Sequence, residues 1–292
     1  MNNIFKNANS LWVKYDKYEW KKDNEGNLFL TPASHAGIKL YNPMKDYEKM
    51  ILDALDVGIL CMRKKSNEET VMNSILTFTE KYGMLGLISS IPAMSDFINY
   101  EYVYLPRNHY IKKESLSTEK YLSYFFPFEK LDFVKNKLES SWSVSGAEMT
   151  ALFLTLNHLP EPVLMSFQKE YSERYDWIRN AFTDMAFTFF SAFLYYQDKD
   201  TFDDDQLSLY QKGMAAFGGI APTYHIELRD KPVIVWEFYS LLLQLQTMLS
   251  LMITDEQSSL KVCKNCGKAY LSKDFNNPFC SKECEDEYGD RH

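Results

Sequence analysis

The segments Cys263-Lys-Asn-Cys266 and Cys280-Ser-Lys-Glu-Cys284 lie near the C-terminus, with thirteen residues between them, and contain four of the five cysteines. Structural zinc sites hold Zn²⁺ with four cysteine or histidine ligands in a tetrahedron, and cysteines two or three residues apart can bind one ion together. Two such pairs complete the four ligands and leave no open position for water. The spacing therefore predicts one structural Zn²⁺ per chain, without a catalytic role for the metal.

The residues around these cysteines predict the local structure of a small zinc finger. Gly267 permits a sharp turn after the first pair, and residues 268–271 have the composition of a short strand. A turn is predicted at Asn276-Asn-Pro278, followed by a helix over 282–288 that carries Cys284 in its first turn. A knuckle, a hairpin and then a helix form a treble-clef arrangement.

Two disulfides, or thiols without a metal, are the alternative interpretation of these cysteines. Disulfides require an oxidising compartment, and the first six residues lack the continuous apolar segment of a secretory signal. We therefore expect a cytoplasmic protein whose cysteines bind zinc.

The motif Cys263-Lys-Asn-Cys266-Gly-Lys, together with Phe279-Cys-Ser-Lys-Glu-Cys284, resembles the C-terminal finger of bacterial CGNR-type zinc-finger proteins. That resemblance implies an intracellular protein with a proposed link to transcription. With Tyr82-Gly-Met-Leu-Gly86 and Met214-Ala-Ala-Phe-Gly-Gly219, the whole chain is similar to a group of uncharacterised bacterial proteins with this layout, which implies no activity. Glu285-Asp-Glu287 stands where the CGNR pattern has Gly-Asn-Arg, and the usual basic tail is missing.

The charge of the chain argues against nucleic acid as a partner. The formal net charge is −8, and residues 261–292 contain six basic and six acidic residues before the thiolates are counted. Affinity for nucleic acids comes mostly from Lys and Arg near phosphates. The basic groups Arg63-Lys-Lys65 and Arg107 with Lys112-Lys113 are interpreted as solvated loop residues. The sequence thus predicts a protein-interaction module, with a CGNR-like nucleic-acid-binding regulator as the alternative.

Length and composition indicate a helix-dominated α+β protein. The 292 residues are 46% hydrophobic and 25% charged, which is ordinary for a globular chain. We expect a helix-rich body over 1–255, with two packed halves meeting near 110–145, and a zinc finger over 256–292. The aromatic share of 15% is interpreted as helical core packing, with a stacking surface for bases or sugars as the alternative.

Hydrophobic periodicity and capping residues predict most of the helices of the body. Asn42-Pro43 begins a helix that runs through Met62, and Ser66 with Glu69 forms a capping box for a helix that ends at Gly83. The longest apolar period extends from Tyr171 to Tyr196. The acids at 203–205 favour the start of a helix that Gly218-Gly219 ends, with a divalent cation site as the alternative.

The apolar segment 232–253 could be mistaken for a membrane span. Glu237, Ser240, Gln244 and Thr247 recur within it at helical spacing, and lipid would tolerate that polar stripe badly. The segment is therefore predicted to be the buried central helix, with Asp230 as its N-cap and Pro232 in its first turn. No membrane partner is expected.

Strand signals are fewer. Residues 12–20 and 28–31, around the turn at 23–27, predict an N-terminal hairpin. A second hairpin is predicted for 149–156 and 163–167, with helix as the alternative for these residues.

An enzyme is the third functional hypothesis and the weakest. His225 and Glu227 share one face if Thr223-Tyr-His225-Ile-Glu227 forms a strand, which makes them candidate catalytic residues. Zinc deaminases combine such a His-x-Glu with paired cysteines, but here no proline precedes the first pair and a long apolar segment intervenes. An ion-paired surface strand is the simpler interpretation. Cys61 lies in an apolar run and is expected to be an inert core thiol.

Overall fold

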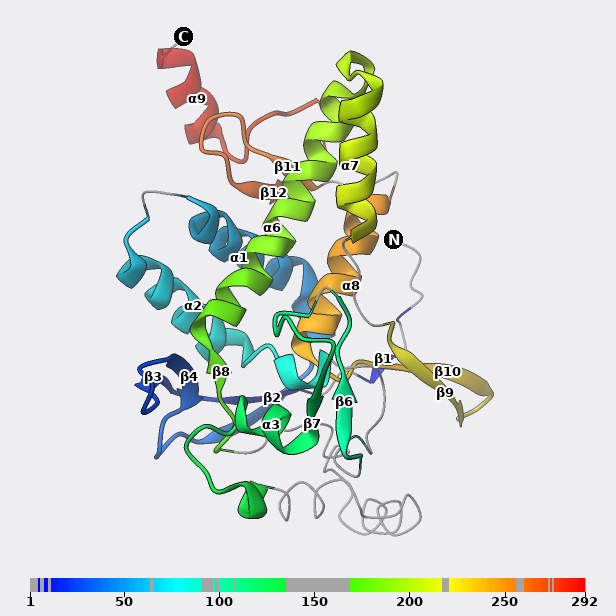
Figure 1. The fold of residues 1–292 in the computed structure, drawn as a ribbon. Coiled ribbons are helices and arrows are strands. Elements are labelled where there is room, and N and C mark those ends of the chain that lie inside the picture. Colours follow the sequence, from blue (N-terminus) through cyan, green and yellow to red (C-terminus); the bar gives the residue numbers. More distant parts are fainter. Residues whose placement is uncertain are drawn as a thin grey trace.

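The computed structural model describes residues 5, 8–9, 12–63, 66–90, 97, 100–107, 109–134, 169–216, 221–255, 260–272, 274 and 276–291 (Figure 1). The helices in this part of the chain are α1 (Tyr47–Met62), α2 (Glu68–Tyr82), α3 (Thr118–Ser123), α6 (Tyr175–Asp198), α7 (Asp204–Ala216), α8 (Leu241–Thr254) and α9 (Lys282–Arg291), with 3-10 segments η1 (Pro43–Asp46), η2 (Leu87–Ser90) and η5 (Lys199–Thr201). The strands are β1 (Ala8–Asn9), β2 (Trp12–Tyr15), β3 (Tyr18–Lys22), β4 (Leu28–Pro32), β5 (Ile38–Tyr41), β6 (Tyr102–Tyr104), β7 (Ser115–Ser117), β8 (Glu173–Arg174), β9 (Thr223–Leu228), β10 (Pro232–Glu237), β11 (Leu260–Val262) and β12 (Ala269–Leu271).

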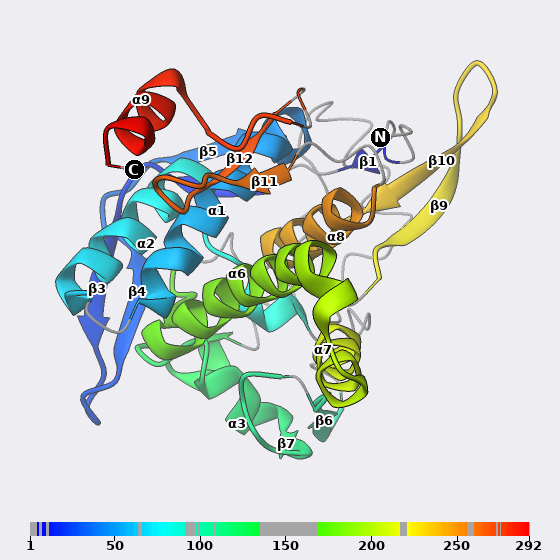
Figure 2. The same cartoon turned by 90° about the horizontal axis from the view of Figure 1, so that it is seen from above.

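Small sheets surround a group of packed helices. In the described residues the sheets have the orders β1-β10-β9, β11-β12, β2-β5, β3-β4-β8 and β6-β7. Figure 2 shows α1, α6 and α8 side by side, with the sheets arranged around them. The chain is thus a mixture of helix and small sheets, and the structure does not confirm the expected dominance of helix. The predicted hairpin over 149–167 lies outside the described residues.

Helices α1 and α6 cross at close range because α1 presents a glycine to its neighbour. The apolar side chains of α6 recur at helical spacing, and Ile178, Phe182 and Met185 are fully buried. A Cβ atom at Gly58 would lie 2.3 Å from the carbonyl oxygen of Phe182 and 2.7 Å from the Cβ of Ala186. Gly58 is therefore the point at which the backbones of the two helices approach each other.

Adding a methyl group at this crossing should separate the two helices. We expect Gly58→Ala to lower the free energy of unfolding by about 3 kcal/mol, because the clash is with backbone and cannot be relieved by a side-chain rotation. Gly213→Ala is the matched control, since nothing lies within 4 Å of a Cβ at this position of α7. The control should raise stability by about 1 kcal/mol through helix propensity. Urea unfolding followed by circular dichroism measures both; equal effects would contradict the role of Gly58.

The N-terminal strands pair differently from the prediction. Residues 12–20 do not form one continuous arm of a hairpin, because the strand is interrupted at Asp16. The Asp16 carboxylate accepts a hydrogen bond from the N–H of Gly37. Strand β3 forms the predicted hairpin with β4, while β2 pairs with β5. The turn at 23–27 is confirmed, and the Asp23 carboxylate accepts the N–H groups of Glu25 and Asn27.

Two of the predicted helix starts differ in detail from the structure, and a third agrees with it. Helix α2 is capped by Asn67, whose side chain accepts the N–H of Glu69, so Ser66 does not form the capping box. Helix α6 begins at Tyr175, because residues 173–174 pair with β4 as strand β8. For α7, the carboxylate of Asp203 accepts the N–H of Gln206 at 2.8 Å, which agrees with a helix-start role for these acids.

The prediction of one helix over 232–253 is wrong at its N-terminal end. Residues 232–237 form strand β10, which pairs with β9 over its full length. Helix α8 begins at Leu241 and is capped by Ser240, whose hydroxyl accepts the N–H of Leu243 at 3.0 Å, so Asp230 is not the N-cap. Continuous apolar runs do not distinguish strand from helix, and here β-branched residues with a neighbouring strand decided the outcome. Within the described residues, no helix has the length and apolar character that crossing a membrane requires.

A buried carboxylate joins two parts of the core. Glu173 is fully buried, and its Oε1 accepts the N–H groups of Gly86 at 2.6 Å and Leu87 at 2.9 Å, together with the Tyr171 hydroxyl at 2.6 Å. Its Oε2 accepts the N–H of Leu85 at 3.1 Å. Burial raises the pKa of the Glu173 carboxyl, while the four donated hydrogen bonds oppose that rise and stabilise the ionised form. Glu173 thus holds the turn after α2 against the start of α6.

Replacing Glu173 by glutamine should be costly although the shape of the side chain is retained. The amide of Glu173→Gln places an NH₂ group against a backbone N–H donor, so we expect a loss of about 3 kcal/mol in the free energy of unfolding. Glu19→Gln is the control, because the Glu19 ion pair with Lys21 is exposed. That variant should change stability by less than about 0.5 kcal/mol. Chemical denaturation measures both, and a loss below about 1 kcal/mol at Glu173 would contradict the role assigned to this carboxylate.

Candidate metal centre

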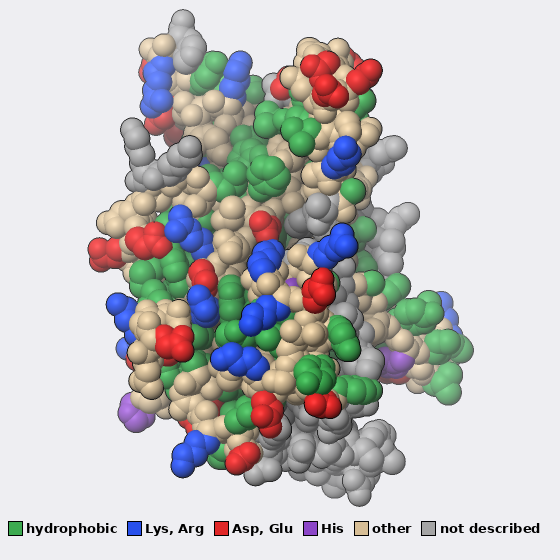
Figure 3. All heavy atoms as spheres, in the orientation of Figure 1, with side chains coloured by type: hydrophobic (Ala, Val, Ile, Leu, Met, Phe, Trp, Pro, Cys, Tyr) green, Lys and Arg blue, Asp and Glu red, His purple; other side chains and the backbone are tan. Residues whose placement is uncertain are grey.

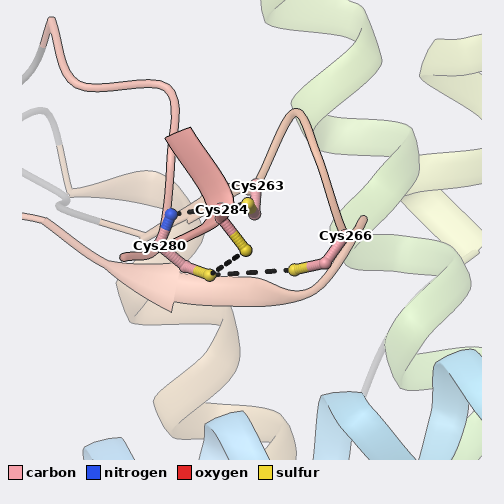
Figure 4. A group of neighbouring side chains, drawn as sticks. All are labelled: Cys263, Cys266, Cys280 and Cys284. Carbon is pink, nitrogen blue, oxygen red and sulfur yellow. Dashed lines mark hydrogen bonds between the residues drawn. The ribbon is translucent and has the colours of Figure 1, made fainter. Parts of the chain in front are cut away.

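The four C-terminal cysteines come from two separate segments of the chain. Cys263 and Cys266 lie in the turn that joins β11 to β12, while Cys280 precedes α9 and Cys284 lies in the first turn of that helix. Figure 4 shows the four sulfur atoms converging on one point between the turn and the helix. The predicted strand over 268–271 and helix over 282–288 are both present as β12 and α9.

The first turn is shaped by a glycine and by main-chain hydrogen bonds. Gly267 has φ 72°, in the left-handed region that favours glycine, and its N–H donates to the carbonyl of Cys263 at 2.9 Å. The N–H of Cys263 donates back to the carbonyl of Lys268 at 2.8 Å. The chain therefore reverses within the Cys-x2-Cys motif and brings both sulfurs to one side.

Further hydrogen bonds position the second cysteine pair. The Tyr270 hydroxyl donates to the carbonyl of Asn277 at 2.7 Å, and the N–H of Lys264 donates to the carbonyl of Pro278 at 2.9 Å. The Ser281 hydroxyl accepts the N–H of Cys284 at 3.3 Å, as residues at helix starts commonly do. These contacts hold the loop before α9 against the turn between β11 and β12.

The distances between sulfurs are suited to a metal ion and do not correspond to disulfide bonds. The Sγ atoms of Cys266 and Cys280 are 3.7 Å apart, and those of Cys280 and Cys284 are 3.5 Å apart. The ligand atoms of all four cysteines lie within 4.8 Å of one another. Tetrahedral zinc with Zn–S bonds of about 2.3 Å places its sulfurs about 3.8 Å apart, whereas a disulfide bond measures about 2.05 Å. The cluster can therefore hold one metal ion.

The thiols of the cluster do not ionise equally. Burial opposes ionisation of Cys263, but N–H donors, including that of Cys280 at 3.4 Å from its sulfur, prevail and lower the pKa of this thiol to about 6. Burial and the neighbouring sulfurs raise the pKa of Cys280 well above its usual range. Four thiolates this close together repel one another, and a bound cation would remove that repulsion.

The cluster of four cysteines is attached to the body of the protein through β11, β12 and α1. Leu260 and Ala269 are buried in the same hydrophobic core as the helices of the body. The Lys268 ammonium lies 3.8 Å from the Asp56 carboxylate of α1. Burial raises the pKa of Asp56, and the charge of Lys268 opposes this rise. No local sequence signal marked Asp56 or Leu260 as part of this attachment, because only the tertiary packing brings them to it.

His225 and Glu227 lie on an exposed strand, as the simpler interpretation expected. The imidazole Nδ1 of His225 is 3.3 Å from a carboxylate oxygen of Glu237, and Glu227 binds Arg229 through two hydrogen bonds of 3.2 and 3.1 Å. The two residues thus pair with different partners, His225 with Glu237 and Glu227 with Arg229. Neither belongs to the cysteine cluster.

Cys61 and the basic groups predicted from the sequence do not belong to the cysteine cluster. Cys61 is buried in α1, and burial raises the pKa of its thiol to about 11, as expected for an inert core cysteine. Lys64 and Lys65 lie outside the described residues, and Arg107, Lys112 and Lys113 are exposed or near-surface residues of the segment between β6 and β7. Among the described residues, the four cysteines form the one group of three or more Cys, His, Asp or Glu ligands that can hold a metal ion.

Comparison with protein-family models, with curated proteins and with solved structures finds no match for this chain. The function of the cysteine cluster is therefore inferred from its geometry alone.

Proposed function

We propose that the four cysteines bind one structural Zn²⁺ and that the resulting treble-clef finger presents helix α9 to a protein partner. The convergence of four sulfurs at separations of 3.5 and 3.7 Å supports the metal, since these values match the edges of a tetrahedron of zinc ligands. When bound, Zn²⁺ would join the β11–β12 turn to the start of α9. With four protein ligands it would have no position for a substrate.

The surroundings of the cluster favour zinc over metals that require other ligands. Thiolates are soft donors that select Zn²⁺, Cu(I) or iron–sulfur clusters over Mg²⁺ and Ca²⁺, and four thiolates in a tetrahedron are typical of structural zinc. The order of β11, knuckle, β12, loop and α9 agrees with the treble clef that we propose. This order supports the proposed resemblance to CGNR-type fingers at the level of the finger alone.

The charge of α9 supports a protein partner over a nucleic acid. The helix, with the sequence KECEDEYGDR, has five acidic and two basic residues, and none of its side chains is buried. An exposed helix of this charge repels phosphates and suits a partner with a basic surface. The neighbouring Lys264 ammonium lies over the Tyr288 ring, 5.0 Å from its centroid, so part of the basic charge is already used within the finger.

Zinc content is the direct test of the metal. We expect one zinc per chain by plasma mass spectrometry of protein purified without chelator, and loss of the zinc in Cys266→Ser. Because zinc contributes about 10 kcal/mol or more to the folding of such fingers, this variant should become protease-sensitive over the last thirty or so residues while the body stays intact.

Cys61→Ala is the matched control for this experiment, because Cys61 is a cysteine outside the cluster. It should retain full zinc occupancy and a resistant C-terminus. Unchanged zinc content and protease resistance in Cys266→Ser would show that the cluster does not hold the metal.

Binding to nucleic acid discriminates between the proposed partner class and the CGNR-like regulator. Fluorescence anisotropy with mixed-sequence duplex DNA, single-stranded DNA and RNA should show no binding at low salt, since the acidic helix and the net charge of −8 oppose phosphate contacts. Binding in the micromolar range or tighter that weakens steeply as salt increases would contradict a protein partner and favour the regulator.

A further inference from the structure

The hairpin of β9 and β10 projects from the body, and no strand of the described residues pairs with its outer edge. Strand β10 lies between β1 and β9, so β9 is the edge of this sheet among the described residues. Figures 1 and 2 both show the hairpin extending away from the helices. A projecting edge strand offers unpaired N–H and C=O groups on which another strand can add.

One face of the hairpin is apolar and exposed to solvent. Alternate residues of β9, namely Tyr224, Ile226 and Leu228, are 61%, 67% and 82% exposed. Ile234 lies opposite Ile226, and Trp236 lies opposite Tyr224, on the same face. Figure 3 shows hydrophobic side chains on the projecting hairpin, beside His and basic side chains. Apolar residues concentrated on an edge strand are unusual unless another surface covers them.

The pairing of β9 with β10 determines which residues face the free edge. Pro232 lies opposite Leu228 and has no N–H, and the N–H of Arg229 donates to the carbonyl of Lys231. Hydrogen-bonded and non-hydrogen-bonded pairs alternate along antiparallel strands. The odd-numbered residues of β9 therefore bond to β10, while Tyr224, Ile226 and Leu228 direct their N–H and C=O groups to the free edge.

We propose that this edge pairs with the same edge of a second copy of the chain, antiparallel and centred on Ile226. A two-fold axis at Ile226 places each Ile226 opposite its own copy and each Tyr224 opposite the partner's Leu228. All three edge residues then exchange main-chain hydrogen bonds with the partner, and their apolar side chains pack across the junction. Such a contact is isologous, because the same surface is used by both chains.

The other face of β9 places no like charges opposite each other in this register. His225 lies opposite the partner's Glu227, and Thr223 lies opposite the partner's Arg229. A centre at residue 227 would place Glu227 opposite its own copy, and like charges directly opposite each other are destabilising. A centre at residue 225 would place Leu228 opposite Pro222, which has no N–H to donate. The centre at Ile226 satisfies both faces of the strand.

Sedimentation velocity of the full chain tests the proposal. We expect a monomer–dimer equilibrium with a Kd of the order of 10 µM, because a single edge pair buries less surface than a permanent dimer does. Ile226→Lys places two ammonium groups at the two-fold axis and should raise the Kd at least about tenfold. Ile38→Lys is the matched control, because Ile38 is an isoleucine on another two-stranded sheet and is 54% exposed. This control should leave the Kd unchanged.

A charge exchange tests the register. His225→Glu places a carboxylate opposite the partner's Glu227 and should weaken the dimer, whereas adding Glu227→Lys to that variant restores opposite charges across the pair and should recover the dimer. A chain that stays monomeric up to about 200 µM would overturn the proposal. So would a dimer that Ile226→Lys leaves intact, or one that the charge exchange does not recover.

Discussion

The body of this protein depends on how one buried carboxylate is satisfied. Glu173 is shielded from solvent. Its carboxylate instead accepts hydrogen bonds from three backbone N–H groups of the turn after α2 and from the Tyr171 hydroxyl. The same turn binds α8, because the carbonyl of Leu85 accepts the N–H of Leu242 at 2.8 Å. The Glu173 side chain therefore links the end of α2 to the start of α6, and the turn that it binds contacts the start of α8 through its own main chain. A buried charge that is fully bonded holds its surroundings in one arrangement, since any other would leave it unpaired.

The cysteine cluster is held in place by two different kinds of contact. Main-chain hydrogen bonds shape the turns that bring the sulfurs together, while Leu260 and Ala269 anchor the strands of the finger in the common core. The strands contact the body, and α9 with the second cysteine pair is connected to them by a loop, by the hydrogen bonds of Tyr270 and Lys264 to that loop, and by the cysteines. The proposed zinc would therefore matter most for α9, which contributes no buried residue of its own.

The two surfaces that we propose for binding lie apart on the molecule. Helix α9 lies on the left and the β9–β10 hairpin on the right in both views (Figures 1 and 2). One surface is the acidic helix α9 next to the cysteine cluster, and the other is the apolar edge strand β9. Self-association through the hairpin would leave α9 exposed on both copies, so the two proposed contacts do not compete for the same surface.

The sequence by itself determined the features that depend on local chemistry. The spacing of the four cysteines, the turn at Gly267, and the apolar period of α6 each involve residues that are close in the chain, so their geometry follows from the backbone alone. Only the tertiary structure decided the features that require a distant partner. Residues 232–237 became a strand because β9 lies beside them, and β2 joined β5 instead of β4. Glu173 became the central contact of the core because packing removed its water and supplied donors about 87 residues away in sequence.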